Sequence, residues 1–289
     1  YIDIKGLSIQ TTDTDPEAYV GAWASGGNMN TARRYLGGCG IQTAALGIAG
    51  YIGGGGPGRK AIVEQYDGTS WTEIADLNAG RASVSGCGTT TAAIVSGGRI
   101  APGPATDDCE QWNGTAWSEV ADLGTARYSA LDLGTSTAAI SVGGYTGSGS
   151  VDVVEQWNGS SWTEVGDLND NRYNINGFGT STAAIAAGGV DNLDKVESWD
   201  NSSWTEIAET NTDRASGGSS GIQTDGMIYG GAPGSKADTE TWDGSSWTEV
   251  ANLATARRLA GSTDGTNSST AAFFGGMVPP GTAATEEWS

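Results

Sequence analysis

The sequence contains no histidine, which removes much of the chemistry available to proteins near neutral pH. Without imidazole there is no Ser-His or Cys-His nucleophilic pair and no His-ligated zinc or copper. Calcium held by Asp191 and Asp194 is an alternative, but these acids lack the spacing of an EF-hand. We therefore predict no catalytic residue, no metal site and no cofactor.

Positive charge, cysteine and long apolar runs are also scarce. The 14 Lys and Arg residues face 34 Asp and Glu, which gives a formal net charge of −20. Such an acidic surface repels phosphate backbones, so we predict no nucleic-acid partner. No segment approaches the roughly 20 consecutive apolar residues of a membrane-spanning helix, so we predict no membrane span. Three cysteines make no disulfide framework, and we expect them to be small buried hydrophobes.

Glycine is abundant instead, at 47 of 289 residues, and most of the sequence is organised as a repeat. A tryptophan, with an arginine ten residues after it, recurs in steps of 48, 46, 45, 42 and 43 residues. The six tryptophans are Trp23, Trp71, Trp117, Trp162, Trp204 and Trp247. Self-similarity at such a period indicates a repeat architecture.

Each copy of the repeat contains four stretches that are typical of short β-strands. In one copy these stretches are residues 128–134, 137–144, 151–157 and 162–168. An Asn-Gly or Asp-Gly pair between the last two stretches is a strong hairpin signal. Four strands in 42 to 48 residues is the period of a propeller blade. We therefore predict an all-β fold, a six-bladed β-propeller of four-stranded blades over residues 20–289.

The two ends of the repeat region complement each other. The last copy stops at 286–288, without a fourth strand, while an isolated fourth strand stands near the N-terminus at 22–25. The N-terminal strand is therefore expected to complete the C-terminal blade, which removes the open edges of the ring. Residues 1–19 lie outside the repeat, and we expect them to form an arm or tether that joins the propeller to a carrier protein. A loosely ordered tail is the alternative that the composition favours equally.

The order Gly-Gly, then Tyr or Trp, then Trp five residues later, then Leu and Arg resembles the kelch repeat of six-bladed propellers. The resemblance covers residues 21–289, with departures such as Ala49 in a Gly-Gly pair and Tyr66 in place of the first Trp. It implies the propeller fold but no single function, because kelch-like propellers include binding modules and the galactose-oxidase group. The Ala/Gly/Thr-rich style is also similar to kelch-like structural proteins of marine bacteriophages.

Residues that recur in every copy are expected to be structural. The tryptophans flanking each hairpin can pack across the strands and fill the space between blades, although an aromatic ladder for bases or sugars is an alternative. The arginines are expected at the starts of the innermost strands, around the central channel, each paired with a repeated Glu because a buried guanidinium needs an anionic partner. An anion site at the channel mouth, joined by Arg34 and Arg258, is the alternative. The structural ring comprises Arg33, Arg81, Arg127, Arg172, Arg214 and Arg257.

The copies differ most in the loop between their second and third strands. We expect these loops on the same face as the connections between blades, and variable loops on a rigid scaffold are a common place for recognition. We therefore predict that this loop face binds a protein or a surface glycan. The candidate residues are Tyr51, Arg59, Lys60, Arg99, Asp107, Asp108, Tyr145, Asp191, Asp194 and Lys236.

The sequence favours a non-enzymatic module displayed on a virion or cell exterior. Its expected role is attachment to a host surface, glycan or partner protein through the loop face. An intracellular kelch-type adaptor for protein partners is the first alternative. A carbohydrate-active enzyme is the second, and it is disfavoured because no pair of acids stands out from the repeats.

Overall fold

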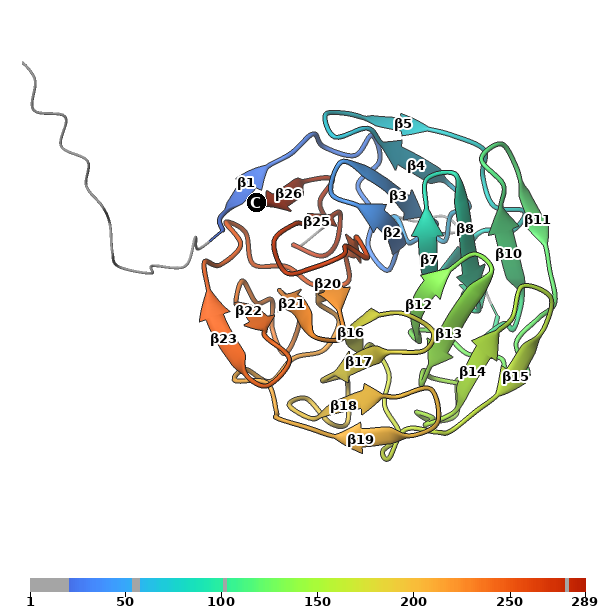
Figure 1. Cartoon of the computed structure of the whole chain (residues 1–289). Coiled ribbons are helices and arrows are strands. Elements are labelled where there is room, and N and C mark those ends of the chain that lie inside the picture. Colours follow the sequence, from blue (N-terminus) through green and yellow to red (C-terminus); the bar gives the residue numbers. More distant parts are fainter. Residues whose placement is uncertain (1–20, 54–57, 101–102, 279–280) are drawn as a thin grey trace, which may run out of the picture.

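The computed structural model describes residues 21–53, 58–100, 103–278 and 281–289. Throughout these ranges the regular structure is β-strand, arranged as six four-stranded antiparallel sheets around a central axis (Figure 1). The predicted fold class, an all-β six-bladed propeller, is confirmed.

Five of the six blades take their strands in chain order from the axis to the rim (Figure 1). Blade 1 contains β2 (Gly37–Ile41), β3 (Ala44–Ile48), β4 (Val63–Tyr66) and β5 (Trp71–Glu73). Blade 2 contains β7 (Ser85–Thr89), β8 (Ala92–Ser96), β10 (Cys109–Trp112) and β11 (Trp117–Glu119). Blade 3 contains β12 (Leu131–Thr135), β13 (Ala138–Val142), β14 (Val154–Trp157) and β15 (Trp162–Glu164).

Blades 4 and 5 repeat this plan, and a small ribbon lies outside it. Blade 4 contains β16 (Asn176–Gly179), β17 (Ala184–Ala187), β18 (Val196–Trp199) and β19 (Trp204–Glu206). Blade 5 contains β20 (Gly218–Ile222), β21 (Asp225–Tyr229), β22 (Thr239–Trp242) and β23 (Trp247–Val250). The ribbon pairs β6 (Arg81–Ala82) with β9 (Arg99–Ile100).

Blade 6 is built from both ends of the chain. Its strands are β24 (Gly261–Ser262), β25 (Ala271–Phe274), β26 (Thr285–Trp288) and, at the rim, β1 (Trp23–Ser25). Trp23 lies opposite Trp288 in the register, with ring centroids 5.7 Å apart, and Figure 1 shows β1 beside β26. The predicted closure by an N-terminal strand is therefore confirmed. The predicted arm, residues 1–19, lies outside the described residues.

The innermost strands are shorter than expected at their start. In blade 3 the ladder begins at Leu131 rather than at residue 128, because Tyr128 pairs with Tyr145 of the loop between the second and third strands. Close packing also explains the glycine content of these strands. A Cβ on Gly38 would lie 2.4 Å from the carbonyl oxygen of Ser262 in the neighbouring blade, which is closer than atoms approach. Side chains at such positions would separate the blades.

The hydrophobic core is divided into clusters between adjacent blades. One cluster combines Ile48 and Val63 of blade 1 with Val95 and Trp112 of blade 2. The hairpin tryptophans pack in pairs as expected, with ring centroids 5.2 to 5.4 Å apart in blades 2 to 5. All tryptophans except Trp23 and Trp162 are buried, so these rings fill the core. The three cysteines are buried and form no disulfide.

Candidate functional site

The six repeated arginines are buried and paired. Each guanidinium lies 2.5 to 3.2 Å from a carboxylate oxygen of the third strand of the blade that follows it in the chain. The pairs are Arg33–Glu64, Arg81–Glu110, Arg127–Glu155, Arg172–Glu197, Arg214–Glu240 and Arg257–Glu286. Their side chains are fully enclosed, so they present no charge to a ligand.

Each ion pair joins the segment that connects two blades to the later of those two blades in the chain. Arg33 donates to the carbonyls of Ala49 and Ile62 as well as to Glu64, and the other oxygen of Glu64 accepts from the amide of Asn30 at 2.6 Å. The predicted position of these arginines around the central channel is wrong, because the residues that line the channel include none of the six. The reason is that their hydrogen-bond partners are strand ends within the blades. The alternative prediction, an anion site at the channel mouth, therefore does not hold for these six arginines.

A closed circle of backbone hydrogen bonds surrounds the channel instead. The residue two positions after each repeated arginine has a left-handed backbone, with φ between 54° and 59°. Its amide donates to the carbonyl of the equivalent residue in the preceding blade over 2.8 to 2.9 Å. The six residues are Tyr35, Ser83, Ser129, Asn174, Ser216 and Leu259. This backbone ring links all six blades.

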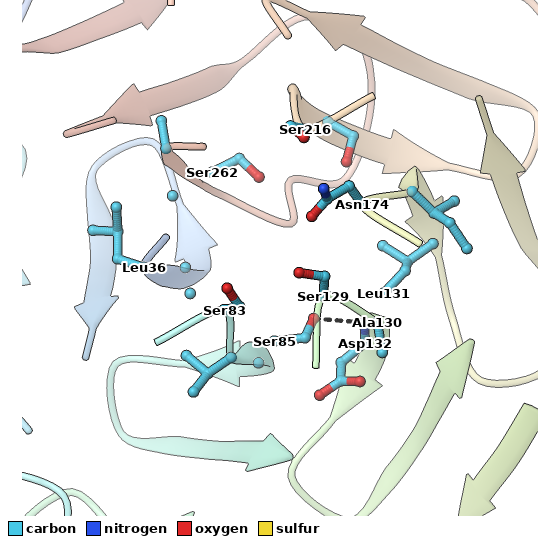
Figure 2. A pocket seen from close by; sticks show the side chains of 18 of the residues that line it. Leu36, Ser83, Ser85, Ser129, Ala130, Leu131, Asp132, Asn174, Ser216 and Ser262 are labelled. Atoms are coloured by element: carbon cyan, nitrogen blue, oxygen red, sulfur yellow. Dashed lines mark hydrogen bonds between the residues drawn. The ribbon is translucent and has the colours of Figure 1, made fainter. Parts of the chain in front are cut away.

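The channel inside the backbone ring is small and polar. It encloses about 120 Å³, well below the roughly 300–1,000 Å³ typical of ligand pockets. Figure 2 shows the side chains of Ser83, Ser129, Asn174 and Ser216 around it. Asp132 also lines the channel, where Ser96 donates to one carboxylate oxygen at 2.7 Å and the other oxygen has no partner among the described residues. Burial raises the pKa of Asp132 to about 6.

Asp264 occupies the channel at a position where the other five blades have glycine. Those glycines are Gly40, Gly88, Gly134, Gly179 and Gly221, all with positive φ. The carboxylate of Asp264 accepts from the amides of Gly40 at 3.4 Å and Gly88 at 3.2 Å, so one side chain joins three blades. Desolvation raises the pKa of Asp264 to about 8. Sequence reasoning missed both acids, because each replaces an uncharged residue in only one blade.

The loop face is built from six pairs of residues around the channel mouth. The residue directly after each repeated arginine pairs in antiparallel fashion with the first residue of the loop between the second and third strands. The pairs are Arg34–Tyr51, Ala82–Arg99, Tyr128–Tyr145, Tyr173–Val190, Ala215–Ala232 and Arg258–Met277. The face is therefore asymmetric, because its aromatic side chains come from the pairs of blades 1, 3 and 4, whereas the pair of blade 5 consists of two alanines.

A hollow of about 380 Å³ opens among these pairs, and we call it the Arg–Tyr hollow. Three arginines and four tyrosines dominate its lining, together with small polar residues of the backbone ring. Its lining is Arg34, Tyr35, Tyr51, Arg59, Ala82, Ser83, Arg99, Tyr128, Ser129, Tyr173 and Asn174. This lining contains no carboxylate, although Asp and Glu outnumber Lys and Arg 34 to 14 in the chain. Positive charge is thus concentrated at one place on an acidic molecule.

Two of the three arginines of the hollow lie over aromatic rings. The Cζ atom of Arg34 lies 5.2 Å from the ring centroid of Tyr51 and 5.8 Å from that of Tyr35. The Cζ of Arg99 lies 5.7 Å from the ring centroid of Tyr128. Cation–π contacts hold a guanidinium in place without neutralising its charge. The Nε of Arg34 is buried and has no hydrogen-bond partner among the described residues.

A row of tyrosines continues from the hollow across blades 3 and 4. The ring of Tyr145 lies 5.4 Å from that of Tyr128 and 5.1 Å from that of Tyr173, in tilted or edge-on geometry. Burial raises the pKa of Tyr173, and the negative charge of Asp191 adds to this shift. The tyrosines therefore form a continuous aromatic wall with hydroxyl groups along it.

The structure brings together some of the predicted loop-face residues and separates others. Tyr51, Arg59 and Arg99 meet in the hollow, and Tyr145 is its immediate neighbour. The remaining candidates lie elsewhere on the loops and do not line the hollow. They are Lys60 and Lys236 where the loops rejoin the blades, Asp107 and Asp108 before the third strand of blade 2, and Asp191 and Asp194 in the loop of blade 4.

Sequence reasoning missed Tyr35, Tyr128 and Tyr173, and it included Arg34 only as an alternative. A signal was present, because the position directly after each repeated arginine varies: it is Arg, Ala, Tyr, Tyr, Ala and Arg in turn. The larger residues at this position, Arg34, Tyr128, Tyr173 and Arg258, are partly exposed, whereas Ala82 and Ala215 are buried. The register of the loops, which places Tyr51 beside Arg34, could not be derived from this signal.

Two further properties bear on what the site holds. Nowhere in the described ranges do three or more His, Cys, Asp or Glu side chains gather closely enough to hold a metal ion. None of the described residues belongs to a helix with the length and apolarity that crossing a bilayer requires.

Comparisons with known proteins support the fold. No protein-family model matches the sequence, and no curated protein matches it. Among solved structures, the chain resembles the structure of YjhT with a TM-score of 0.72 at 14% sequence identity. The match covers 90% of this chain and 95% of YjhT. A likeness at this identity shows a shared fold alone.

Proposed function

We propose that this protein is a non-enzymatic binding module that attaches to a host surface, glycan or partner protein through its loop face. The observation that carries the proposal is the distribution of positive charge. Six arginines are enclosed in ion pairs, and Lys195 is paired with Asp170 and Glu206. The other described cations all belong to loop-face segments: Arg34, Arg59, Lys60, Arg99, Lys236 and Arg258.

Display on a virion or cell exterior is part of the same proposal. A rigid ring with one elaborated face suits a protein that presents that face outward. The net charge of −20 favours solubility and limits non-specific contact with other acidic surfaces. The kelch-like, phage-like style of the repeats supports a structural role of this kind, and the N-terminal arm would join the ring to its carrier.

Among the residues that the structure describes, the hollow lacks the acidic and thiol groups that most glycosidases and thiol enzymes use. Its lining, taken from the described residues, has no Asp, Glu or Cys, so it offers neither a thiol nucleophile nor the two carboxylates that glycosidases use. The two acids with raised pKa, Asp132 and Asp264, lie in the small channel and are bound to Ser96, Gly40 and Gly88. Their hydrogen bonds join neighbouring blades.

Loop replacement tests the proposal directly. Residues 145–150 would be replaced by a short Gly-Ser turn, and binding of the labelled protein to whole cells and to a glycan array would be measured. We expect binding to be lost while the thermal unfolding midpoint changes little, since this loop is on the surface. The matched control replaces the hairpin turn 67–70, which the antiparallel order of the strands places on the opposite face. Equal binding of both variants and the wild type would contradict the proposal.

A further inference from the structure

We infer that the Arg–Tyr hollow binds an acidic saccharide, meaning a sugar ring that carries a carboxylate or sulfate group. This inference rests on the proposed function, because it assigns a ligand class to the centre of the loop face. The hollow of about 380 Å³ has the size of a small-molecule pocket, whereas the channel of about 120 Å³ does not.

The need for an anionic group follows from the arginines. None of Arg34, Arg59 and Arg99 forms an ion pair within the described ranges, and the hollow contains no carboxylate. Arg34 and Arg99 are held by tyrosine rings, which position the guanidinium groups but leave their N–H donors available. A planar fork of N–H donors matches carboxylate and sulfate oxygens.

The rest of the molecule limits how much charge the ligand carries. With a net charge of −20, the surface around the hollow repels any long polyanion. Charges separated by more than about 8 Å are largely screened at physiological salt, so only the charge near the hollow is felt by a small ligand. A ligand with one or two negative charges is therefore favoured over nucleic acid or a densely charged polymer.

A saccharide is favoured over an acidic peptide because the backbone at this mouth is already paired. The amides of Tyr35, Ser83, Ser129 and Asn174 are consumed by the backbone ring, and Arg34 and Tyr51 bond each other through their main chains. A peptide would thus find few main-chain partners. What remains available is aromatic faces, hydroxyls and one side-chain amide, which complement the apolar face and the hydroxyl groups of a sugar ring.

The test compares charged and neutral saccharides on the intact chain. Disaccharides ending in glucuronate or in a 6-sulfated sugar, and their uncharged parents, would be titrated by isothermal calorimetry. We expect binding of at least one charged probe and none of the parents. Arg99→Met and Arg34→Met should each weaken that binding about ten-fold or more, as expected for losing a hydrogen bond to a charged group. Lys195→Met makes the same change in net charge at a cation outside the hollow and outside the loop-face candidates, and it should change affinity less than about two-fold.

Several outcomes would overturn the inference. Equal binding of charged and neutral probes, no binding of either charged probe, or equal effects of Arg99→Met and Lys195→Met would each do so. Tighter binding of a Glu-rich peptide than of either acidic sugar would also contradict it. These failures are distinct from failure of the proposed function, because loss of cell attachment on replacing residues 145–150 is measured without any saccharide probe. The thermal unfolding midpoint of each variant, unchanged within a few degrees, shows that the fold is retained.

Discussion

The amide of Tyr35 donates a hydrogen bond of 2.8 Å to the carbonyl of Leu259, and this bond joins the first blade to the last. Five equivalent bonds complete the backbone ring at the axis, while the pairing of Trp23 with Trp288 closes the propeller at its rim. The ring is therefore closed twice, once by sequence-distant strands and once by backbone groups. The backbone ring, which is the inner closure, fixes the spacing of residues in the Arg–Tyr hollow. The reason is that Tyr35, Ser83, Ser129 and Asn174 belong both to the ring and to the lining of the hollow.

The left-handed backbone of the inner closure makes a prediction about Ser129, whose φ is 56°. A β-branched residue is a steric outlier in this region, whereas glycine adopts it without strain. Ser129→Val should therefore lower the free energy of unfolding by about 1–3 kcal/mol, and Ser129→Gly should leave it within about 1 kcal/mol. Urea denaturation measures both. Ser118, exposed on the regular strand β11, is the control, and Ser118→Val should be close to neutral. Equal effects of the two valine variants would contradict the account.

The buried ion pairs make a second prediction, at Arg127. Replacing Arg127 with Met leaves Glu155 buried without its partner, which costs about 3–5 kcal/mol. The double variant Arg127→Met/Glu155→Gln should recover part of this loss, because no uncompensated charge remains. Arg99→Met is the control, since Arg99 is exposed and outside the ion pairs, and it should leave the denaturation midpoint unchanged. If Arg127→Met folds with wild-type stability and loses only ligand binding, the result would contradict a structural role for this arginine.

The pKa of Asp264 predicts how stability varies with pH. An Asp has a pKa near 3.9 in an unfolded chain and about 8 at this position in the folded one. Between these values the folded chain holds a proton that the unfolded chain has lost, so the free energy of unfolding falls as pH rises from about 4 to about 8. The raised pKa of Asp132 adds to the fall between about 4 and 6. Thermal unfolding midpoints should therefore be higher at pH 5 than at pH 8.

Asp264→Asn tests the origin of this pH dependence. The amide keeps an oxygen that can accept from Gly40 and Gly88 but cannot ionise, so the variant should be more stable than the wild type at pH 8 and less sensitive to pH. Asp243→Asn is the control. Hydrogen bonds from Ser245 and Ser246 lower the pKa of Asp243 to about 2, so its contribution changes only below about pH 4. Identical pH profiles for the wild type and Asp264→Asn would refute this explanation.

The propeller could be predicted from sequence because the residues that characterise a blade recur once in each blade. Trp71 and Arg81 have equivalents at regular steps, and hairpin turns and glycine-rich strands fall at the same places in each copy. Closure could be predicted as well, because the strand missing after Trp288 is present at Trp23. These inferences depend only on counting equivalent positions, and counting does not require knowledge of how blades pack.

The site could be predicted only in part, because it depends on the residues that do not recur. Tyr51, Arg59 and Arg99 were expected on one face, but their meeting with Tyr128 depends on the path of each loop. The backbone ring has no residue-type signal, since Tyr, Ser, Asn and Leu all adopt its left-handed conformation. The prediction that the arginines line the channel was wrong. The spacing of a repeated residue predicts where it recurs in the chain but not the direction in which its side chain points.

The outer closure predicts a difference between two adjacent residues of β1. The bonds between Ala22 and Ser289 and from Gly26 to Thr285 place the amide of Ala24 toward β26 and that of Ser25 away from it, since antiparallel hydrogen-bonded pairs alternate. Ala24→Pro removes a ladder bond and should lower the free energy of unfolding by about 1–3 kcal/mol. It should also promote self-association, measured by light scattering, through the exposed edge of β26. Ser25→Pro keeps the ladder and should change stability by less than about 1 kcal/mol, because proline is tolerated where the amide faces solvent. Equal effects of the two substitutions would show that β1 does not hold the ring closed.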